Sequence, residues 1–261
     1  MDMYYTTGQI DQTKTACDRN GGSAQKVQPR FVSMGFGPVV AATRTTFTAK
    51  AQEDMLLKYA IFGAPAPGFV NDFVIGNQSL NCSDSDIDLA VFSSFSQRVP
   101  AIGVAVDGNI QISVTVTLDA NGGFAGGFSA DPVDKAPKLS DQCQNLNKYF
   151  GLGSVSVPAS GTAQLNAQAL RDCFLSDLVV HNHTAAVETT EIVITDITVA
   201  GRSLLSGQSS DGISLHALNE FVQKHMALIN TAIETNQRVI VTISNQNALT
   251  PALVGGACYA R

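Results

Sequence analysis

Short stretches of alternating hydrophobic and polar residues, separated by turn-forming residues, cover most of the chain. Residues 45–51 and 55–62 follow this pattern and are rich in β-branched, aromatic and other apolar residues, which favours strands over helices. Residues 101–106 and 110–118 flank an Asp-Gly-Asn turn at 107–109, an arrangement typical of a β-hairpin. The pattern therefore predicts a protein built mainly of short strands.

Other stretches support the same interpretation. Gly35 and Gly37 are expected to break the strand at residues 31–40, and two prolines make residues 63–68 a loop. The remaining expected strands are residues 69–75, 163–167, 173–180, 191–199, 238–244 and 248–258.

One stretch has the helical period instead, because its apolar residues recur every three or four positions. These residues are Leu215, Leu218, Val222, Met226, Ile229 and Ile233. Ser214 is placed to cap the first turn of this helix, and Asp88 has the matching position earlier in the chain. Pro100 would end the earlier helix after a shorter run.

The second half of the chain repeats parts of the first half in the same order. The clearest pair is residues 72–80 (DFVIGNQSL) and 196–204 (DITVAGRSL), which share the initial Asp and the final Ser-Leu. The other pairs are 53–62 with 171–180, 87–89 with 213–215, and 111–117 with 238–244. The separation between the copies increases only between these pairs, where loops would absorb insertions. The ordered set indicates a tandem duplication.

The duplication predicts two tandem β-sandwich modules. We expect an N-terminal arm (residues 1–30), a first module (31–133), a linker (134–154) and a second module (155–261).

The two modules should have the same strand order, with equivalent residues in equivalent cores. Leu57 should match Leu175, and Val114 should match Val241. The second module should also contain a longer loop between Val180 and Glu191.

The chain is poor in charge. Charged residues make up only 15%, against a usual ~25%, and Ser, Thr, Asn, Gln and Gly provide the polar share. Such a surface is weakly protected against association, which favours burial against neighbouring chains, although a secreted β protein with a neutral surface would have the same composition. The net charge is −6 and no run of Lys or Arg occurs, so direct nucleic-acid binding is not expected.

The five cysteines are widely spaced: Cys17, Cys82, Cys143, Cys173 and Cys258. They form no Cys-x-x-Cys pair, so neither a zinc knuckle nor a redox motif is indicated. Cys173 matches Met55 and is interpreted as a small hydrophobic core residue. Free thiols fit synthesis in a reducing cytosol, and the N-terminus lacks the pattern of a signal peptide. No apolar run reaches the ~20 residues of a membrane span.

Three carboxylates alternate at Asp84, Asp86 and Asp88, a spacing that could converge on calcium. An EF-hand loop that starts at Asp84 would need Gly at its sixth position and Glu at its twelfth, where this chain has Leu89 and Phe95. We therefore interpret the stretch as a solvated acidic turn in which Asp88 caps a helix.

His181 and His183 are two residues apart, with Glu188 and Glu191 nearby, and such a pair can bind zinc when further ligands arrive from elsewhere. The same spacing is common in exposed loops, so no metal site is expected here. The chain contains no Gly-x-Ser-x-Gly motif and no recognisable Ser-His-Asp set. We therefore predict no catalytic, cofactor-binding or metal-binding residues, and no enzyme activity.

The paired segments 53–62 with 171–180, 72–80 with 196–204, and 111–117 with 238–244 carry a resemblance in architecture. The chain resembles the double jelly-roll major capsid proteins of tailless icosahedral viruses, in which two β-sandwiches stand side by side. The resemblance covers residues 31–258. The pattern shows six or seven strands per module where a jelly roll has eight, and it shows no long tower loops.

The resemblance implies an all-β fold of two tandem jelly-roll-like sandwiches, with one inserted helix in the second. It implies a structural capsid protein that assembles as pseudo-hexameric homotrimers into an icosahedral shell, is located in the virion and is made in the host cytoplasm. Partners would be neighbouring capsomers, other capsid proteins or an internal membrane. The alternative is a two-domain β-sandwich binding module, such as an adhesin or carbohydrate binder, although this chain has no Trp and only five Tyr for a sugar site.

Overall fold

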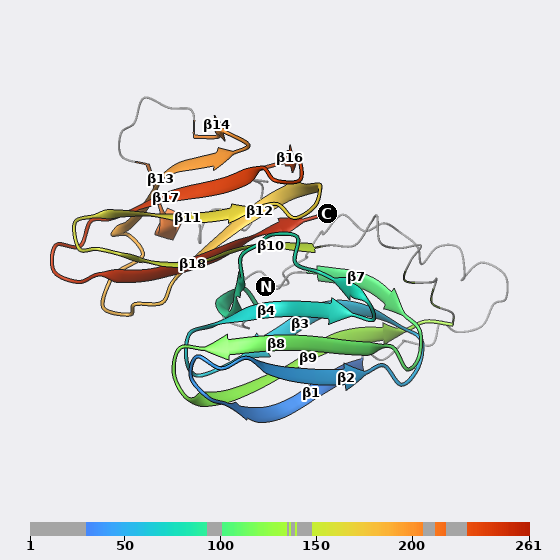
Figure 1. The fold of residues 1–261 in the computed structure, drawn as a ribbon. Coiled ribbons are helices and arrows are strands. Elements are labelled where there is room, and N and C mark those ends of the chain that lie inside the picture. Colours follow the sequence, from blue (N-terminus) through green and yellow to red (C-terminus); the bar gives the residue numbers. More distant parts are fainter. Residues whose placement is uncertain are drawn as a thin grey trace, which may run out of the picture.

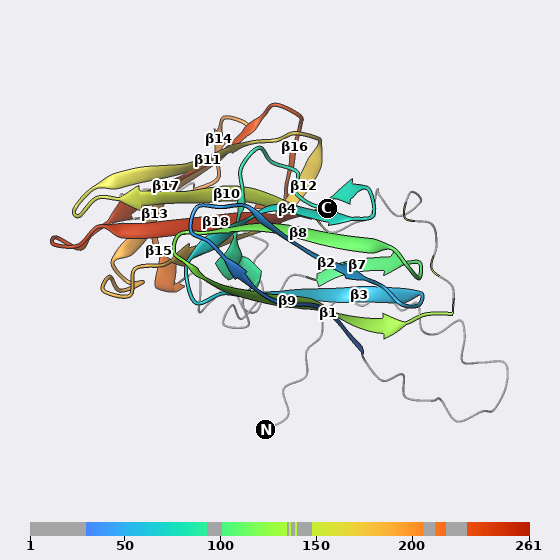
Figure 2. The same cartoon turned by 60° about the horizontal axis from the view of Figure 1, so that its bottom comes forward.

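The computed structural model describes residues 30–92, 101–134, 136, 139, 148–205, 212–217 and 229–261, with Ala101 described by its backbone only. Two β-sandwiches follow each other along the chain and lie side by side, the first coloured blue to green and the second yellow to red (Figures 1 and 2). Within the described ranges, no helix has the length and apolar character needed to cross a membrane.

The first module has two antiparallel sheets. One has the order β1-β9-β3-β7, and the other has the order β2-β8-β4-β5, with β6 also paired to β4. The strands are β1 (Arg30–Val39), β2 (Thr45–Lys50), β3 (Met55–Gly63), β4 (Gly68–Ile75), β5 (Gln78–Ser79), β6 (Ile87–Asp88), β7 (Ala101–Val106), β8 (Gln111–Leu118) and β9 (Gly122–Pro132).

The second module repeats this arrangement. Its sheets have the orders β10-β18-β12-β16 and β11-β17-β13-β14, with β15 also paired to β13. The strands are β10 (Lys148–Val157), β11 (Thr162–Gln168), β12 (Cys173–Asn182), β13 (Ile192–Val199), β14 (Arg202–Ser203), β15 (Ile213–Ser214), β16 (Thr231–Ile233), β17 (Arg238–Asn245) and β18 (Ala252–Ala260).

Both modules have the strand order of a jelly roll. In each module, the first strand pairs with the last and the last pairs with the third, while the second strand pairs with the strand before the last. The predicted fold class, an all-β chain of two tandem jelly-roll-like sandwiches, is confirmed.

The repeated segments occupy equivalent strands, as the duplication predicts. Residues 53–62 and 171–180 lie on β3 and β12, and residues 111–117 and 238–244 lie on β8 and β17. Leu57, Leu175, Val114 and Val241 are all fully buried. The first two belong to the third strand of each module and the other two to the strand before the last, so the predicted core equivalences are confirmed.

The shared Asp and Ser of the clearest repeat have a structural role. A β-bulge precedes Asp72 in β4 and Asp196 in β13, and both Asp residues are then paired with a Thr. The hydroxyl of Ser203 donates to Asp196 Oδ1 at 2.5 Å, and that of Ser79 donates to Asp72 Oδ1 at 3.4 Å. The contact links the two strands of the hairpin beyond the bulge in each module.

The two cores differ in composition. Five rings pack together in the first module, with centroid separations of 4.9 to 6.2 Å. They are Phe62, Phe73, Phe92, Phe124 and Phe128. The second core is filled mainly by Leu, Ile, Val and Ala side chains. The same strand order is therefore stabilised by different packing in the two modules.

The prediction that Gly35 and Gly37 break the first strand is wrong. β1 continues through both residues, and Gly35 lies at a bulge with φ of 82°. Gly153 occupies the equivalent bulge of β10 with φ of 67°. Only glycine adopts this backbone without strain, so here glycine marks a bulge within a strand.

Two predicted boundaries differ from the strands of the structure. The predicted arm (residues 1–30) includes Arg30, where β1 begins, and the predicted linker (residues 134–154) includes Lys148, where β10 begins. Residues 148–154 are therefore part of a strand and not of a linker. The sequence pattern does not predict this strand, because the bulge at Gly153 interrupts its alternation of apolar and polar residues. Residues 1–29 lie outside the described residues, and the division into modules otherwise stays a prediction.

The predicted helix of the second module begins as expected. Leu215–Ala217 are helical, and Ser214 Oγ accepts a hydrogen bond from the N–H of Ala217 at 3.2 Å. Leu218, Val222 and Met226 lie outside the described residues. The predicted end was wrong, since Ile233 lies in β16, where it pairs with Cys173.

The first module has a counterpart at the equivalent position, as predicted, while the relative length of the two helices stays a prediction. A 3-10 helix, η2, spans Leu89–Phe92, and Asp88 Oδ1 accepts a hydrogen bond from the N–H of Ala90 at 2.8 Å. The second module also has the longer loop, residues 183–191, although His181 lies within β12 and not in the loop. Pro100 lies outside the described residues.

Candidate functional site: the junction between the modules

The segment after β5 joins the two modules. Residues 80–88, here called the bridging segment, run along β10 of the second module. The N–H of Tyr149 donates to Leu80 O, and the N–H of Cys82 donates to Tyr149 O, both at 2.8 Å. Further along, the N–H of Gly153 donates to Asp86 O at 2.9 Å. The bridging segment is therefore held to the second module by backbone hydrogen bonds.

Side chains cross the junction in both directions. Tyr149 and Ala257, from the second module, belong to the core cluster of the first. Cys82, from the first module, belongs to the core cluster of the second. The Tyr149 ring is 5.0 Å from Phe92 and 6.0 Å from Phe73 between centroids, and its burial raises the pKa of its hydroxyl. The two modules therefore share apolar surface and form one packed unit.

The three carboxylates predicted as an acidic turn have different roles. Asp84 Oδ1 accepts a hydrogen bond from the N–H of Gln168 at 2.7 Å, and Asp86 Oδ2 accepts one from Asn71 Nδ2 at 2.9 Å. Asp88 is fully buried, so the interpretation of this stretch as solvated is wrong for Asp88. Its capping contact with Ala90 confirms the other part of that prediction.

Asp88 contacts His183, one of the two histidines considered above as zinc ligands, across the junction. Its Oδ2 atom is 2.6 Å from Nε2 of His183, which follows β12. A Cβ atom at Gly255 would overlap the same carboxylate oxygen. The absence of a side chain at Gly255 therefore allows Asp88 to enter the second module and reach His183.

The two histidines have opposite electrostatic environments. Burial lowers the pKa of His183, but the hydrogen bond and the charges of Asp88 and Asp119 outweigh burial, so the net shift is upward. Burial and the neighbouring His183 lower the pKa of His181. Nε2 of His181 is buried and has no hydrogen-bond partner among the described residues.

Glu188 and Glu191 do not join the histidines. The carboxylate of Glu191 accepts hydrogen bonds from Asn247 Nδ2 at 3.0 Å, and Glu188 Oε2 accepts one from Thr190. Among the described residues, no group of three or more His, Cys, Asp or Glu side chains is arranged to hold a metal ion. The expectation that this chain has no metal site stays a prediction.

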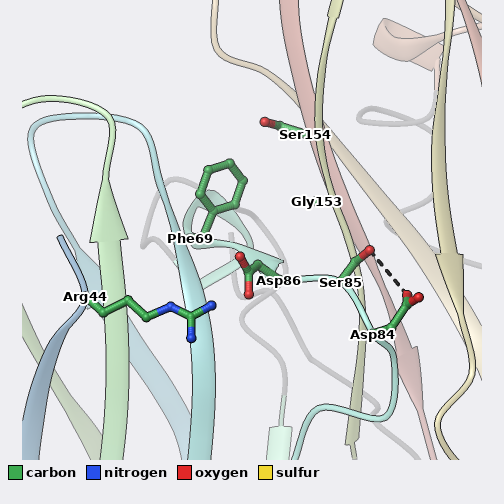
Figure 3. Close-up of a pocket in the computed structure, with 7 residues that line it drawn as sticks. All are labelled: Arg44, Phe69, Asp84, Ser85, Asp86, Gly153 and Ser154. Atoms are coloured by element: carbon green, nitrogen blue, oxygen red, sulfur yellow. Dashed lines mark hydrogen bonds between the residues drawn. The ribbon is translucent and has the colours of Figure 1, made fainter. Parts of the chain in front are cut away.

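A polar hollow of about 370 Å³ opens at the junction. Figure 3 shows Arg44 of the first module pointing toward Asp86, with β10 of the second module on the opposite side. The residues that line the hollow are Arg44, Phe69, Asp84, Ser85, Asp86, Gly153 and Ser154. In this hollow, Ser85 Oγ lies 3.5 Å from Asp84 Oδ1.

The sequence does not predict two contacts of the junction, those of Arg171 and of Cys82. Nη2 of Arg171 donates to the carbonyls of Ser79 and Asn81 at 2.6 and 3.0 Å, so this cation ties the second module to the start of the bridging segment. Cys82 lies against Cys173. No local pattern marks either contact, because each joins residues that are about 90 positions apart in the chain.

The first module has an exposed apolar face on its β1-β9-β3-β7 sheet. Phe31 and Phe36 on β1 are 57% and 77% exposed, and Tyr59 on β3 is also exposed. Glycines lie beneath the two phenylalanine rings, at Gly127 and Gly123. We call Phe31, Phe36, Tyr59 and the partly exposed Ile61 the open face.

A comparison with solved structures gives a distant likeness. No family model matches the chain, and no curated protein matches it. Among solved structures, it is similar to the major capsid protein P2 from bacteriophage PM2, with 9% sequence identity and a TM-score of 0.41. The match covers 89% of this chain and 97% of that chain. The fold assignment above rests on the chain's own strand order and not on this likeness.

Proposed function

We propose that this chain is a structural protein of a viral capsid that assembles from copies of itself as homotrimers. The strand order alone does not decide this, because jelly rolls occur in capsids and in lectins, and a fold does not define a function. The supporting observation is that the described residues leave open, in the first module, the sheet face that is covered in the second.

The two faces are equivalent residue by residue. Phe31 lies two positions before the bulge of β1, and Tyr149 lies two positions before the bulge of β10. Ile61 pairs with Gly127, and Val179 pairs with Ala257, at matching places in the two sheets. In the second module Tyr149, Ala257 and Val179 pack against the core of the first. In the first module, the counterparts Phe31 and Ile61 belong to the open face, and the third counterpart, Gly127, lies beneath the Phe31 ring.

A second copy of the chain is the occupant that fits this face. Within one chain, the face of the second module is covered by β6 and η2 of the first. The equivalent elements of the second module are β15 and the helix that begins at Leu215. The same docking, repeated between chains, would lay these elements of one copy on the open face of the next. The contact is head-to-tail, and contacts of this kind form a ring when the rotation between successive copies closes.

Three chains arranged in this way would present six similar modules. Such a tile could cover a shell by repeated contacts of one type, which is the role proposed here, with the virion as its location. A chain with only 15% charged residues suits broad contacts that do not require the desolvation of many charges. Neighbouring capsomers are the expected partners, and other capsid proteins or an internal membrane are further ones.

Light scattering coupled to size-exclusion chromatography tests the proposal. We expect the purified chain to be a trimer or a larger assembly at micromolar concentration. Phe31→Asp and Phe36→Asp should each give a folded monomer, because a charge on the open face would be buried without a partner in the contact. The matched control is Leu249→Asp, since Leu249 is 90% exposed, precedes β18 and lies on the second module. This variant should assemble like the wild type.

A wild-type chain that stays monomeric across salt concentration and pH would contradict the proposal. The same exposed aromatic residues would then favour the alternative of a two-domain binding module, such as an adhesin. Assembly that survives both Phe substitutions would preserve the capsid role and reject the open face as the contact.

A further inference from the structure

Two thiols from different modules face each other at the junction. Sγ of Cys82 lies 3.4 Å from Sγ of Cys173, although the residues are 91 positions apart in the chain. Cys82 belongs to the bridging segment, and Cys173 is the first residue of β12. A bond between them would connect the modules at a place where backbone hydrogen bonds already hold them together.

The backbone around both cysteines is fixed. The N–H of Cys82 donates to Tyr149 O, and the N–H of Leu170 donates to Cys82 O, at 2.8 and 2.9 Å. Cys173 is paired with Ile233 between β12 and β16. A disulfide has an S–S length of about 2.05 Å, so the two sulfurs need to approach by roughly 1.4 Å. Side-chain rotation is the motion available for this approach.

The two thiols differ in reactivity. A hydrogen bond from Cys82 lowers the pKa of Cys173, burial opposes this shift, and the cations Lys148 and Arg171 add to it. The same hydrogen bond and burial raise the pKa of Cys82. Cys173 also keeps 8% exposure, whereas Cys82 has none. Cys173 is therefore the thiolate that meets an oxidant first, since the thiolate is the reactive form.

We propose that Cys82 and Cys173 form a disulfide that locks the two modules together when the protein meets a small-molecule disulfide. The thiolate of Cys173 attacks the small disulfide, forming a mixed disulfide and releasing one small thiolate. The sulfur of Cys82 then attacks Cys173, loses its proton to the departing group and releases a second small thiol. Two cysteines are oxidised and one small disulfide is reduced to two thiols.

The disulfide should stabilise the folded chain. The bond closes a long loop, and constraining a long loop in the unfolded chain raises stability. It also keeps the bridging segment on the second module when other contacts of the junction open. Cys82 is the thiol placed to attack the mixed disulfide, because its sulfur lies 3.4 Å from that of Cys173. Cys258 is also fully buried, and burial raises its pKa.

The experiment uses the full chain with Cys17→Ala and Cys143→Ala, so that only Cys82, Cys173 and Cys258 remain. The protein is incubated with oxidised glutathione, denatured, alkylated and analysed by peptide mass spectrometry. We expect a peptide pair joined through Cys82 and Cys173, two hydrogens lighter than the separate peptides. The apparent melting temperature should rise by roughly 4–12 °C, and a reducing agent should reverse the change.

Matched variants distinguish the effect of the Cys82–Cys173 disulfide from other effects of oxidation. Cys258→Ala should still form the bond and show the rise in melting temperature, whereas Cys82→Ala should do neither while keeping its native circular dichroism. Three outcomes would overturn the proposal: free Cys82 after oxidation, a lasting glutathione adduct on Cys173, or a bond between Cys173 and Cys258. If Cys82→Ala fails to fold, the peptide pair in the Cys258→Ala protein still decides the question.

Discussion

Phe31 and Tyr149 occupy equivalent positions in the first strands of the two modules, yet Tyr149 is 1% exposed and Phe31 is 57% exposed. The difference arises because the first module covers the sheet face around Tyr149, while nothing in the described part of the chain covers the face around Phe31. One duplicated strand thus has two environments, one inside the junction and one on the open face.

This difference predicts unequal effects of the same kind of truncation. Tyr149→Ala should lower the free energy of unfolding by ~3–5 kcal/mol, because it leaves a cavity where three rings meet. Phe31→Ala should change it by less than about 1 kcal/mol. Both are measured by urea unfolding in the Phe36→Asp background, where we expect a monomer. Equal losses would show that the two positions have the same burial in solution.

The equivalence of the cores predicts a symmetric result. Leu57→Ala and Leu175→Ala should each lower the free energy of unfolding by ~2–5 kcal/mol, because both side chains are fully buried in a packed sandwich. The matched control is Leu249→Ala, which removes the same atoms from a 90% exposed position and should cost less than about 0.5 kcal/mol. Denaturant titration followed by circular dichroism gives all three values. A loss confined to one module would contradict the equivalence.

Local patterns in the sequence were sufficient to predict the modules but not the junction. The echoes around Asp72 and Asp196 predicted the shared strands, because a bulge and its Asp-Ser contact are encoded within a few residues. Tyr149 could not be placed in this way. It points away from the core of its own module, and an outward-facing aromatic looks the same whether solvent or another module lies beyond it.

The same limit explains the errors at Asp88 and at the cysteines. Asp88 was correctly predicted as a helix cap from its neighbours, but its burial depends on Gly255 and His183, which are distant in sequence. Cys173 was correctly predicted as a core residue, yet the approach of Cys82 depends on the path of the bridging segment. Strand β10 is absent from the predicted strands, because the bulge at Gly153 interrupts its alternation.

We expect that position 255 needs a glycine because Asp88 of the first module packs against it, and not because the backbone of β18 requires one. Its equivalent in the first module is Ala125, which pairs with Phe36 just as Gly255 pairs with Ser154. That strand position therefore accepts a Cβ. Gly255→Ala should nevertheless lower the free energy of unfolding by roughly 1–3 kcal/mol, because the added Cβ overlaps the Asp88 carboxylate.

The matched control for Gly255→Ala is Gly63→Ala. A Cβ at Gly63 has no neighbour within 4 Å, so this substitution should be neutral or slightly stabilising. Thermal and urea unfolding of the two variants provide the comparison. An unchanged stability of Gly255→Ala would show that Asp88 does not enter the second module as described.

The pH dependence of stability should reveal the contact between Asp88 and His183. The folded pKa of His183 lies above its ordinary value, which is about 6.5. Its stabilising contribution is therefore fully present below pH ~6.5 and is lost as pH rises through the higher folded value. His181 acts in the opposite direction. Its pKa is lowered, so the stability linked to its neutral form is present above pH ~6.5 and is lost as pH falls.

Single substitutions separate the two contributions. His183→Gln should destabilise the protein more at pH 5.5 than at pH 8.5, by roughly 1–3 kcal/mol at the lower pH, because a hydrogen bond between charged groups is lost. His181→Gln should have the reverse trend and lose less stability, or gain some, at pH 5.5. The charges of Asp88 and Asp119 raise the pKa of His183, so Asp119→Asn should reduce the pH dependence without abolishing it. Urea unfolding at the two pH values measures each effect. A loss in His183→Gln that is independent of pH would mean that His183 is neutral in the folded protein and that its contact with Asp88 is an uncharged hydrogen bond.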